Sequence, residues 1–227
     1  MKLVTVSGPP ASGKTAVIVH LIHYLRQKQL KAGVVKFDCL TTGDGEIYAR
    51  HQIPVQIGLA GNLCPDHYFG GNAEICFDWG LKEQFDYLII ESAGLCNRCS
   101  PHLTGQYAIC VIDNLMGTEA PRKIGPMLKM ADAVVITKGD VVSQAEREIY
   151  ALQIRRANPQ GLILSVNGIT GQGCEALGAV MQQKARDYTP ETALRYAMPA
   201  AICTYCRGIT SLDSNLLVGA FKEMTIK

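Results

Sequence analysis

The sequence lacks several features that would assign it to particular classes of protein. It has no apolar run long enough to span a bilayer, so we expect no membrane partner. The formal net charge is only +2, so neither sign of charge dominates. This balance argues against a nucleic-acid-binding groove. No signal peptide, internal repeat or low-complexity tract is visible. These absences predict a cytoplasmic protein whose partners are neither membranes nor nucleic acids.

The cysteine content is the first positive feature. Nine cysteines in 227 residues are an odd number in a chain that is too long for a small disulfide scaffold. In a reducing compartment, clustered cysteines point instead to metal or redox chemistry. The length is sufficient for one sizeable α/β core, or for a domain with an appendage.

The segment from Gly8 to Thr15 carries the clearest chemistry. It reads G-x-x-x-x-G-K-T, the pattern of a P-loop, and consists of Gly8, Pro9, Pro10, Ala11, Ser12, Gly13, Lys14 and Thr15. A β-rich run, Lys2 to Val6, precedes it, and apolar residues at helical spacing follow in 16–29. The pattern predicts a nucleoside triphosphate site in which Lys14 reaches the β- and γ-phosphates and Thr15 binds Mg²⁺.

Further along the chain, apolar runs alternate with helical patterns. We expect strands at 31–38, 85–91, 107–113, 133–137 and 162–166, and helices at 72–82, 124–130, 142–157 and 174–186. An irregular, glycine-rich loop is expected at 58–71. This alternation predicts an α/β P-loop NTPase fold, a mostly parallel sheet with helices on both faces. Residues 1–186 would form the domain, and 187–227 a C-terminal extension that packs on it.

The loop Thr137-Lys138-Gly139-Asp140 follows a predicted strand, where a base-reading loop belongs. A carboxylate at Asp140 accepts hydrogen bonds from the N1 and N2 groups of guanine, whereas adenine offers no such paired donors. The stem of Lys138 can lie along the base, and Val166 with Asn167 forms a second polar loop at a strand end. The alternative is an ordinary helix-entry turn capped by Asp140. Together with the P-loop, this loop favours GTP over ATP.

Two acids, Asp38 and Glu91, end predicted strands beside the phosphate site. Acids in that position hold Mg²⁺ or orient the attacking water, which makes Lys14, Asp38 and Glu91 the candidate catalytic residues. Gly94 follows Glu91 and can offer its N–H to the γ-phosphate. Alternatively, the two acids are simple caps.

Soft metal ligands gather at three places in the sequence. The segments are Cys64-Pro65-Asp66-His67, Cys96-Asn97-Arg98-Cys99 and Cys203-Thr204-Tyr205-Cys206. A C-x-x-C pair lets two thiolates meet one metal ion, but a structural zinc site needs four ligands. The other cysteines lie in or beside apolar runs and are expected to be core residues: Cys39, Cys76, Cys110 and Cys174.

These residues resemble the nickel-insertion accessory GTPases of hydrogenase and urease maturation, the HypB/UreG family within the SIMIBI class. The resemblance covers roughly 1–183. It rests on Gly8 to Thr15, the Asp38 segment, Cys64 to His67, Asp86 to Gly94, Asp113, Pro121 to Pro126 and Thr137 to Asp140. It implies a P-loop fold, GTP hydrolysis, a metal site near the loops that sense the γ-phosphate, and nucleotide-linked homodimerisation.

The chain departs from this family in three respects. The urease branch has Cys-Pro-His, whereas here Asp66 is inserted before His67. No histidine-rich N-terminal tail is present, and the pair Cys203 and Cys206 has no counterpart in the family. We expect a nickel or zinc site built from Cys64, His67 and Cys96 or Cys99. The alternative joins Cys96 and Cys99 to Cys203 and Cys206 in a structural zinc site.

The resulting hypothesis is a GTPase with slow intrinsic turnover that assembles metallocentres. It would bind GTP and Mg²⁺, and deliver a transition metal ion, nickel first, to a client metalloenzyme or its accessory proteins. The rivals are an iron–sulfur or redox-linked P-loop ATPase carrier, in which the C-x-x-C pairs hold a cluster, and a small-molecule kinase.

Overall fold

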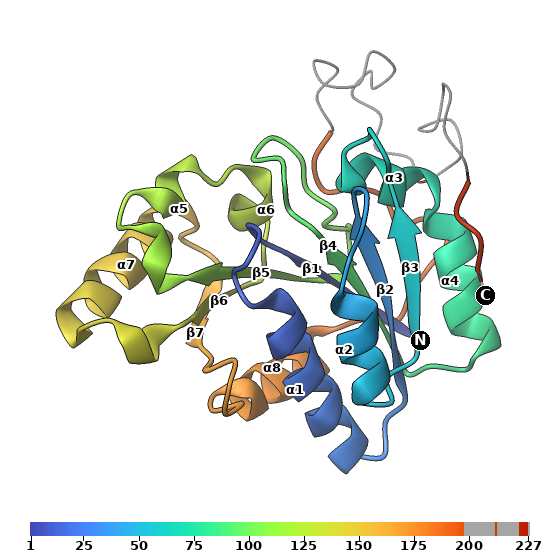
Figure 1. Ribbon diagram of the computed structural model, residues 1–227, viewed down its shortest axis with the longest axis horizontal. Helices are drawn as coiled ribbons and strands as arrows, with labels where there is room; N and C mark the ends of the chain where they lie inside the picture. The colour runs from blue at the N-terminus through green and yellow to red at the C-terminus, as the bar shows by residue number, and fades with distance from the viewer. Residues whose placement is uncertain (198–211, 213–222, 227) are drawn as a thin grey trace.

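The protein folds around one seven-stranded sheet (Figure 1). The computed structural model describes residues 1–197, 212 and 223–226. The strand order is β3-β2-β4-β1-β5-β6-β7, and all six neighbouring pairs are parallel. The strands are β1 Lys2–Ser7, β2 Ala32–Asp38, β3 Val55–Leu59, β4 Tyr87–Ser92, β5 Tyr107–Asp113, β6 Ala133–Thr137 and β7 Leu162–Ser165. The expected α/β class is therefore confirmed.

Helices cover both faces of this sheet (Figure 1). They are α1 Lys14–Gln27, α2 Asp44–Arg50, α3 Pro65–Gly71, α4 Ala73–Lys82, α5 Ala120–Lys123, α6 Pro126–Lys129, α7 Gln144–Ala157 and α8 Cys174–Lys184. Short 3-10 turns occupy Asn114–Met116 and Gly139–Val141. One face packs against α1, α2 and α8, and the other against α3 and α4 on one half and α5 to α7 on the other.

The alternation of side chains along each strand decides which residue joins which core. Val4 and Val6 of β1 pack beneath α1, whereas Leu3 points to the face that carries α3 and α4. Because both faces are covered, nearly every strand residue must be apolar, which is why the strands read as continuous hydrophobic runs. Lys36, inside the apolar run of β2, is buried nonetheless.

Two expectations about local structure are wrong. The loop predicted at 58–71 contains α3, which begins at Pro65 and buries Tyr68 and Phe69 against the sheet. Proline favours the first turn of a helix because its φ is already helical and no N–H is lost there. The helix expected at 124–130 is wrong in its bounds, because α6 occupies only Pro126–Lys129 and a separate short helix, α5, ends before it at Lys123. Pro126 disfavours helical backbone at Gly125, and a Cβ there would lie 2.0 Å from the carbonyl oxygen of Asn97.

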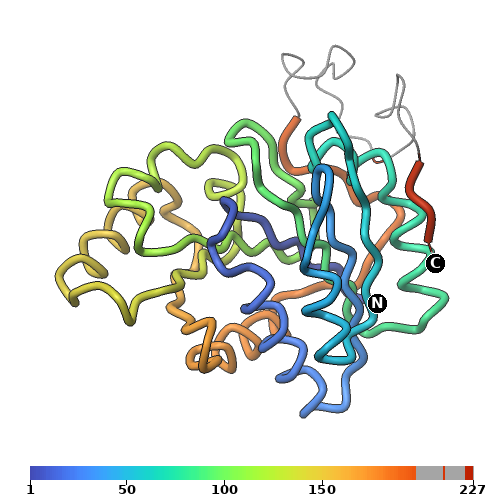
Figure 2. The backbone as a smooth tube through the Cα atoms, viewed as in Figure 1, coloured from blue at the N-terminus to red at the C-terminus, as the bar shows by residue number. Residues whose placement is uncertain are grey.

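Residues after α8 return along the sheet (Figure 2). Asp187 forms an antiparallel bridge with Lys2, and Leu194 forms another with Leu103. The Arg195 guanidinium binds the Asp132 carboxylate through both of its terminal nitrogens, at 3.0 and 2.7 Å. Cys203 and Cys206 lie outside the described residues. Among the residues that are described, no helix is both long and apolar enough to cross a membrane.

A buried histidine braces the strand that leads into the P-loop. The Nε2 of His102 lies 2.8 Å from the Met127 carbonyl oxygen, which can only accept, so Nε2 carries the proton. Its Nδ1 then accepts from the Thr5 hydroxyl at 2.8 Å, while Ser7 Oγ lies 3.2 Å from Nε2. Burial lowers the pKa of His102 from 6.5 to about 4, so the ring is neutral in the folded protein near pH 7.

We expect the His102 ring to make stability depend on pH. Between pH 6.5 and about 4 the unfolded chain binds a proton that the folded protein does not, so stability falls as the pH falls. The loss across this window is about 3 kcal/mol. Urea unfolding from pH 7 to 4.5 should show the difference in unfolding free energy between wild type and His102→Asn shrinking as the pH falls. Exposed His51→Asn is the control, and a constant difference for His102→Asn would contradict the prediction.

Candidate functional site

The P-loop lies where β1 meets α1, at the carboxyl edge of the sheet. Gly8, Ala11 and Gly13 all have positive φ, at 145°, 58° and 89°, which curls the backbone around a phosphate-sized space. The Lys14 side chain is buried and its Nζ donates to the carbonyls of Gly8 at 2.8 Å and Pro9 at 2.9 Å. Burial lowers the pKa of Lys14 to about 8, although the Glu91 charge opposes this shift.

Glu91 connects the P-loop to the neighbouring strand and helix. It is fully buried at the end of β4, and its Oε1 accepts from Thr15 Oγ1 at 3.0 Å and from Lys36 Nζ at 2.9 Å. Its Oε2 accepts from the Tyr48 hydroxyl of α2 at 2.6 Å. Burial and the Glu91 charge raise the pKa of Tyr48 well above its usual range, so Tyr48 remains a donor. Glu91 is therefore much more than a strand cap.

Asp38 lies at the end of β2, close to this group but less tightly bound. Its Oδ1 accepts from the backbone N–H of Cys39 at 2.9 Å, as in a simple cap, and its Oδ2 lies 3.9 Å from Lys36 Nζ. Asp44, at the start of α2, is closer, with its Oδ2 at 2.6 Å from the same Nζ. Burial alone would lower the pKa of Lys36, but Glu91 and Asp44 outweigh it and the pKa is raised.

The donors gathered here fit Mg²⁺. The Thr15 hydroxyl and the carboxylates of Asp38, Asp44 and Glu91 are hard oxygen ligands, the kind that Mg²⁺ prefers. Lys36, Asp44 and Tyr48 were not predicted from the sequence. A signal existed for Lys36, since it interrupts the apolar run of β2 and a lysine buried in a central strand needs charged partners.

The predicted base loop borders a cavity of about 380 Å³ at the carboxyl ends of β6 and β7. Gly139 and Asp140 line it from one side, and Val166 and Asn167 from the other, as the sequence predicts. Arg147 of α7, which was not predicted, also lines the cavity and donates to the Gly139 carbonyl at 2.6 Å. The four residues expected to bind the base therefore share one cavity, which leaves their role in base binding as a prediction.

Thr137 and Lys138 contact the P-loop rather than line this cavity. The Thr137 hydroxyl donates to the Ser12 carbonyl at 2.7 Å. Lys138 Nζ donates to the Ala11 carbonyl at 2.8 Å and lies 3.2 Å from Asp113 Oδ2. These two residues therefore link the loop at 137–140 to the P-loop by direct hydrogen bonds.

The loop after Glu91 is packed directly on the P-loop. Gly94 has φ 66°, and a Cβ at this residue would lie 1.9 Å from the carbonyl oxygen of Gly8. Lys14 Nζ also lies 3.4 Å from the Ala93 carbonyl. Only glycine permits so close an approach with this backbone conformation, so the two loops are in direct backbone contact.

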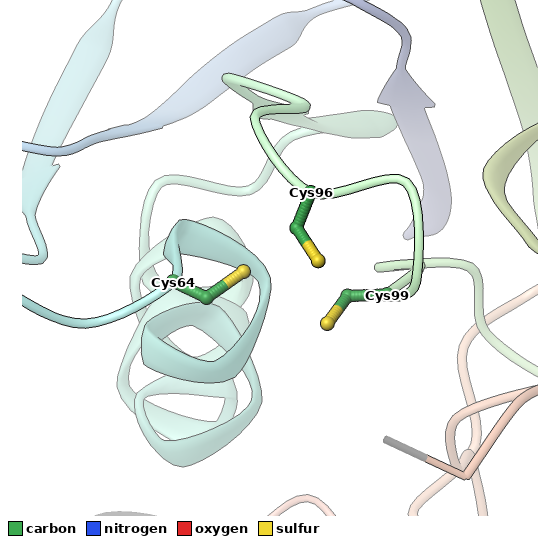
Figure 3. Close-up of side chains that lie close together, drawn as sticks. All are labelled: Cys64, Cys96 and Cys99. Carbon is green, nitrogen blue, oxygen red and sulfur yellow. The ribbon is translucent and has the colours of Figure 1, made fainter. Parts of the chain in front are cut away.

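Three cysteine sulfurs meet at the far end of the same loop (Figure 3). Cys64 lies just before α3, while Cys96 and Cys99 lie in the loop after β4. Their Sγ atoms are all within 4.8 Å of one another. The sequence left open whether Cys96 or Cys99 joins Cys64, and the fold brings both to it. His67 lies beside this group, with Nδ1 at 3.8 Å from Cys99 Sγ, but does not join it.

The surroundings favour a thiolate at Cys64. The Cys99 thiol donates toward it and lowers the pKa of Cys64, while the same contact raises the pKa of Cys99. A thiolate is the form that binds a metal ion. His67 Nε2 and Asp66 Oδ2 are buried side-chain atoms without a hydrogen-bond partner among the described residues. The chemistry of this donor set, three thiols beside an imidazole, suits a borderline or soft divalent ion.

Asp66 stands between the cysteine group and the phosphate site. The hydroxyl of Ser92, the residue after Glu91, donates to Asp66 Oδ1. Burial and then the nearby Cys64 raise the pKa of Asp66 to about 7, although the hydrogen bond from Ser92 opposes the shift. The inserted residue thus links the turn that carries Cys64 to the strand end that carries Glu91.

The remaining cysteines follow the expected pattern with one exception. Cys76, Cys110 and Cys174 are buried in the apolar cores. Cys39 is only half-buried, since β2 ends at Asp38 and the chain turns outward there. The alternative zinc site, which needs Cys203 and Cys206, involves residues that the structure does not describe.

Comparisons with known proteins agree with this geometry. The family model described as the CobW/HypB/UreG nucleotide-binding domain matches residues 2–165. An uncharacterized protein of Methanocaldococcus jannaschii is 43% identical over 225 residues, covering 99% of this chain and 96% of that protein. The urease accessory protein UreG of Edwardsiella ictaluri is 30% identical over 191 residues, covering 77% of this chain and 90% of UreG.

The fold also has solved counterparts. The crystal structure of HypB from Helicobacter pylori in complex with nickel superposes with a TM-score of 0.66 and 21% sequence identity. The match covers 83% of this chain and 91% of that one. At this identity the likeness supports the fold.

We expect Asp140 to select guanine. Replacing it by alanine removes a charged acceptor of two hydrogen bonds, so GTP affinity should fall by roughly 30- to 100-fold while ATP affinity stays unchanged. Competition of GTP and ATP against a fluorescent GTP analogue measures both. Glu148→Ala, at an exposed acid of α7, is the control. An unchanged GTP-to-ATP preference in Asp140→Ala would show that Asp140 does not read the base.

Proposed function

The chain belongs to the CobW/HypB/UreG nucleotide-binding family, and on that premise we propose that it is a GTP-hydrolysing metallochaperone. It would couple GTP binding and hydrolysis to delivery of a transition metal ion, nickel in the first place, to a client metalloenzyme or its accessory proteins. The HypB structure named above contains nickel, which supports this choice of cargo by analogy.

One observation carries the proposal: the sulfurs of Cys96 and Cys99, on the loop that leaves β4, lie within 4.8 Å of each other and of the Cys64 sulfur, which precedes α3. A cargo site must both hold its ion and release it. A site whose ligands come from two segments can do so, because separating the segments breaks it. Here one segment precedes α3 and the other follows β4, and the second one contacts the P-loop through Gly94.

The connection between nucleotide and cargo runs through Ser92 and Asp66. Ser92 is adjacent to Glu91, and its hydroxyl binds the Asp66 carboxylate, which lies between Cys64 and His67 in sequence. Glu91 in turn binds Thr15 of the P-loop. Two hydrogen bonds, Thr15 to Glu91 and Ser92 to Asp66, therefore connect the P-loop to the segment that carries Cys64. A rearrangement at Thr15 during hydrolysis would move this segment through them.

Hydrolysis itself would depend on charge and position. Lys14 would neutralise phosphate oxygens, the backbone N–H of Gly94 would be offered to the γ-phosphate, and Asp38 or Glu91 would orient the water. Thr15, Asp38, Asp44 and Glu91 would hold Mg²⁺, which supplies further neutralisation of the triphosphate. We expect slow turnover, because phosphoryl transfer depends mainly on positioning and charge stabilisation and a partner would be needed to complete the site. We infer that a homodimer forms around the metal and the nucleotide.

The first test removes one sulfur. Cys64→Ala should lower the affinity for nickel and zinc at least about 100-fold, because only two of the three thiols remain. It should also abolish the dependence of this affinity on a non-hydrolysable GTP analogue, because both remaining thiols lie on the same loop. Calorimetric titration with and without the analogue measures this. The matched control is Cys174→Ala, a buried cysteine of α8 that is distant in the fold. Full GTP-dependent affinity in Cys64→Ala would refute the cargo site.

Two further measurements separate the alternatives. Cys203→Ala should leave nickel affinity intact if the cargo site is the cysteine triad, and should lower it if Cys203 and Cys206 complete a zinc site. Protein purified without oxygen should be colourless and prefer GTP. A brown protein that prefers ATP would favour the iron–sulfur carrier.

The second test addresses coupling. Ser92→Ala removes the donor to Asp66 without touching a cysteine, so metal affinity without nucleotide should stay within about threefold while the effect of the GTP analogue on it falls at least about fivefold. The same titrations measure both quantities. Ser100→Ala, at a buried serine of the loop that follows β4, should retain the full effect. Intact coupling in folded Ser92→Ala would exclude this route.

A further inference from the structure

Lys36 is a charged residue where the fold predicts an apolar one. It lies in β2 between β3 and β4 and is almost completely buried. Its Nζ lies 2.6 Å from Asp44 Oδ2, 2.9 Å from Glu91 Oε1 and 3.9 Å from Asp38 Oδ2. The ammonium is thus in contact with two of the three carboxylates that fit Mg²⁺ and close to the third.

The arrangement places Lys36 beside the P-loop threonine. Glu91 Oε1 accepts from Lys36 Nζ and from Thr15 Oγ1 at the same time. A divalent ion bound to the Thr15 hydroxyl oxygen and to these carboxylates must therefore share them with a fixed positive charge. Three carboxylates and one ammonium leave this group with two net negative charges instead of three.

We propose that Lys36 is a tethered cation of the nucleotide site, a positioning residue that sets how strongly triphosphate binding depends on Mg²⁺. The ammonium holds Asp44 and Glu91 in place and offsets their repulsion of the triphosphate. It also weakens their affinity for Mg²⁺ alone, so that the ion enters together with the nucleotide.

Lys36 further connects the nucleotide site to α2. Asp44 is the first residue of α2, and Tyr48 of the same helix donates to Glu91. The Lys36–Asp44 pair therefore fixes the start of this helix against the sheet, and loss of the ammonium leaves like charges facing one another there. This inference requires triphosphate binding but not the metal cargo, so it stands or falls independently of the cysteine site.

The experiment compares Lys36→Met with wild type by calorimetry. The affinity for a non-hydrolysable GTP analogue is measured in EDTA and in saturating Mg²⁺. The dissociation constant in EDTA divided by that in Mg²⁺ should rise at least about tenfold in Lys36→Met. Without the ammonium, the three carboxylates repel the triphosphate more strongly and attract the ion more strongly. Mg²⁺ alone should raise the melting temperature of Lys36→Met and leave that of wild type nearly unchanged.

Three variants make the outcome decisive. Lys36→Arg keeps the charge and should retain the wild-type ratio, and Lys31→Met removes an exposed lysine just before β2 and should do the same. Lys36→Gln repeats the measurement if the methionine variant does not fold. A ratio unchanged within about twofold in the neutral variants overturns the proposal. So does an equal change in Lys36→Arg, since charge would then not be the cause.

Discussion

The buried carboxylate of Glu91 is the point on which the rest of the site depends. A carboxylate without solvent is costly unless donors surround it, and Glu91 accepts from Thr15, Lys36 and Tyr48. These donors come from the P-loop helix, from β2 and from α2. One side chain therefore holds together the phosphate site, the neighbouring strand and the helix that follows it.

The position of Glu91 in the sheet explains how two chemistries come to share one loop. In a parallel sheet the carboxyl ends of all strands meet at one edge, and β4 lies next to β1 and β2. The chain that leaves β4 must first pass the P-loop, where Gly94 permits contact with Gly8, and only then reaches Cys96 and Cys99. Hard oxygen ligands consequently gather on the strand ends, and sulfur ligands lie one loop farther out.

The two groups of potential metal ligands differ in chemistry as well as in position. Mg²⁺ prefers the carboxylate and hydroxyl oxygens around Thr15, whereas three sulfurs and an imidazole favour a borderline or soft ion. Asp66 lies between the oxygen ligands and the sulfur ligands, and it accepts a hydrogen bond from Ser92. A buried carboxylate with one oxygen unpartnered is sensitive to small shifts of its neighbours, which suits a connection between binding events.

Much of the architecture follows from local sequence. Strand periodicity, the P-loop and the polar loops at strand ends specify the parallel sheet, the phosphate site and the base cavity, because they depend on residues close in the chain. The helix at Pro65 was missed, since burial of Tyr68 and Phe69 against a sheet outweighs local turn signals. Lys36, Asp44 and Tyr48 were missed because their partners lie on other elements. The resemblance led us to expect Cys64 beside Cys96 or Cys99, but only the folded loops show that both sulfurs lie beside that of Cys64 and that His67 does not join the three. Contacts between distant segments depend on the packing of the whole sheet, which no short stretch of sequence encodes.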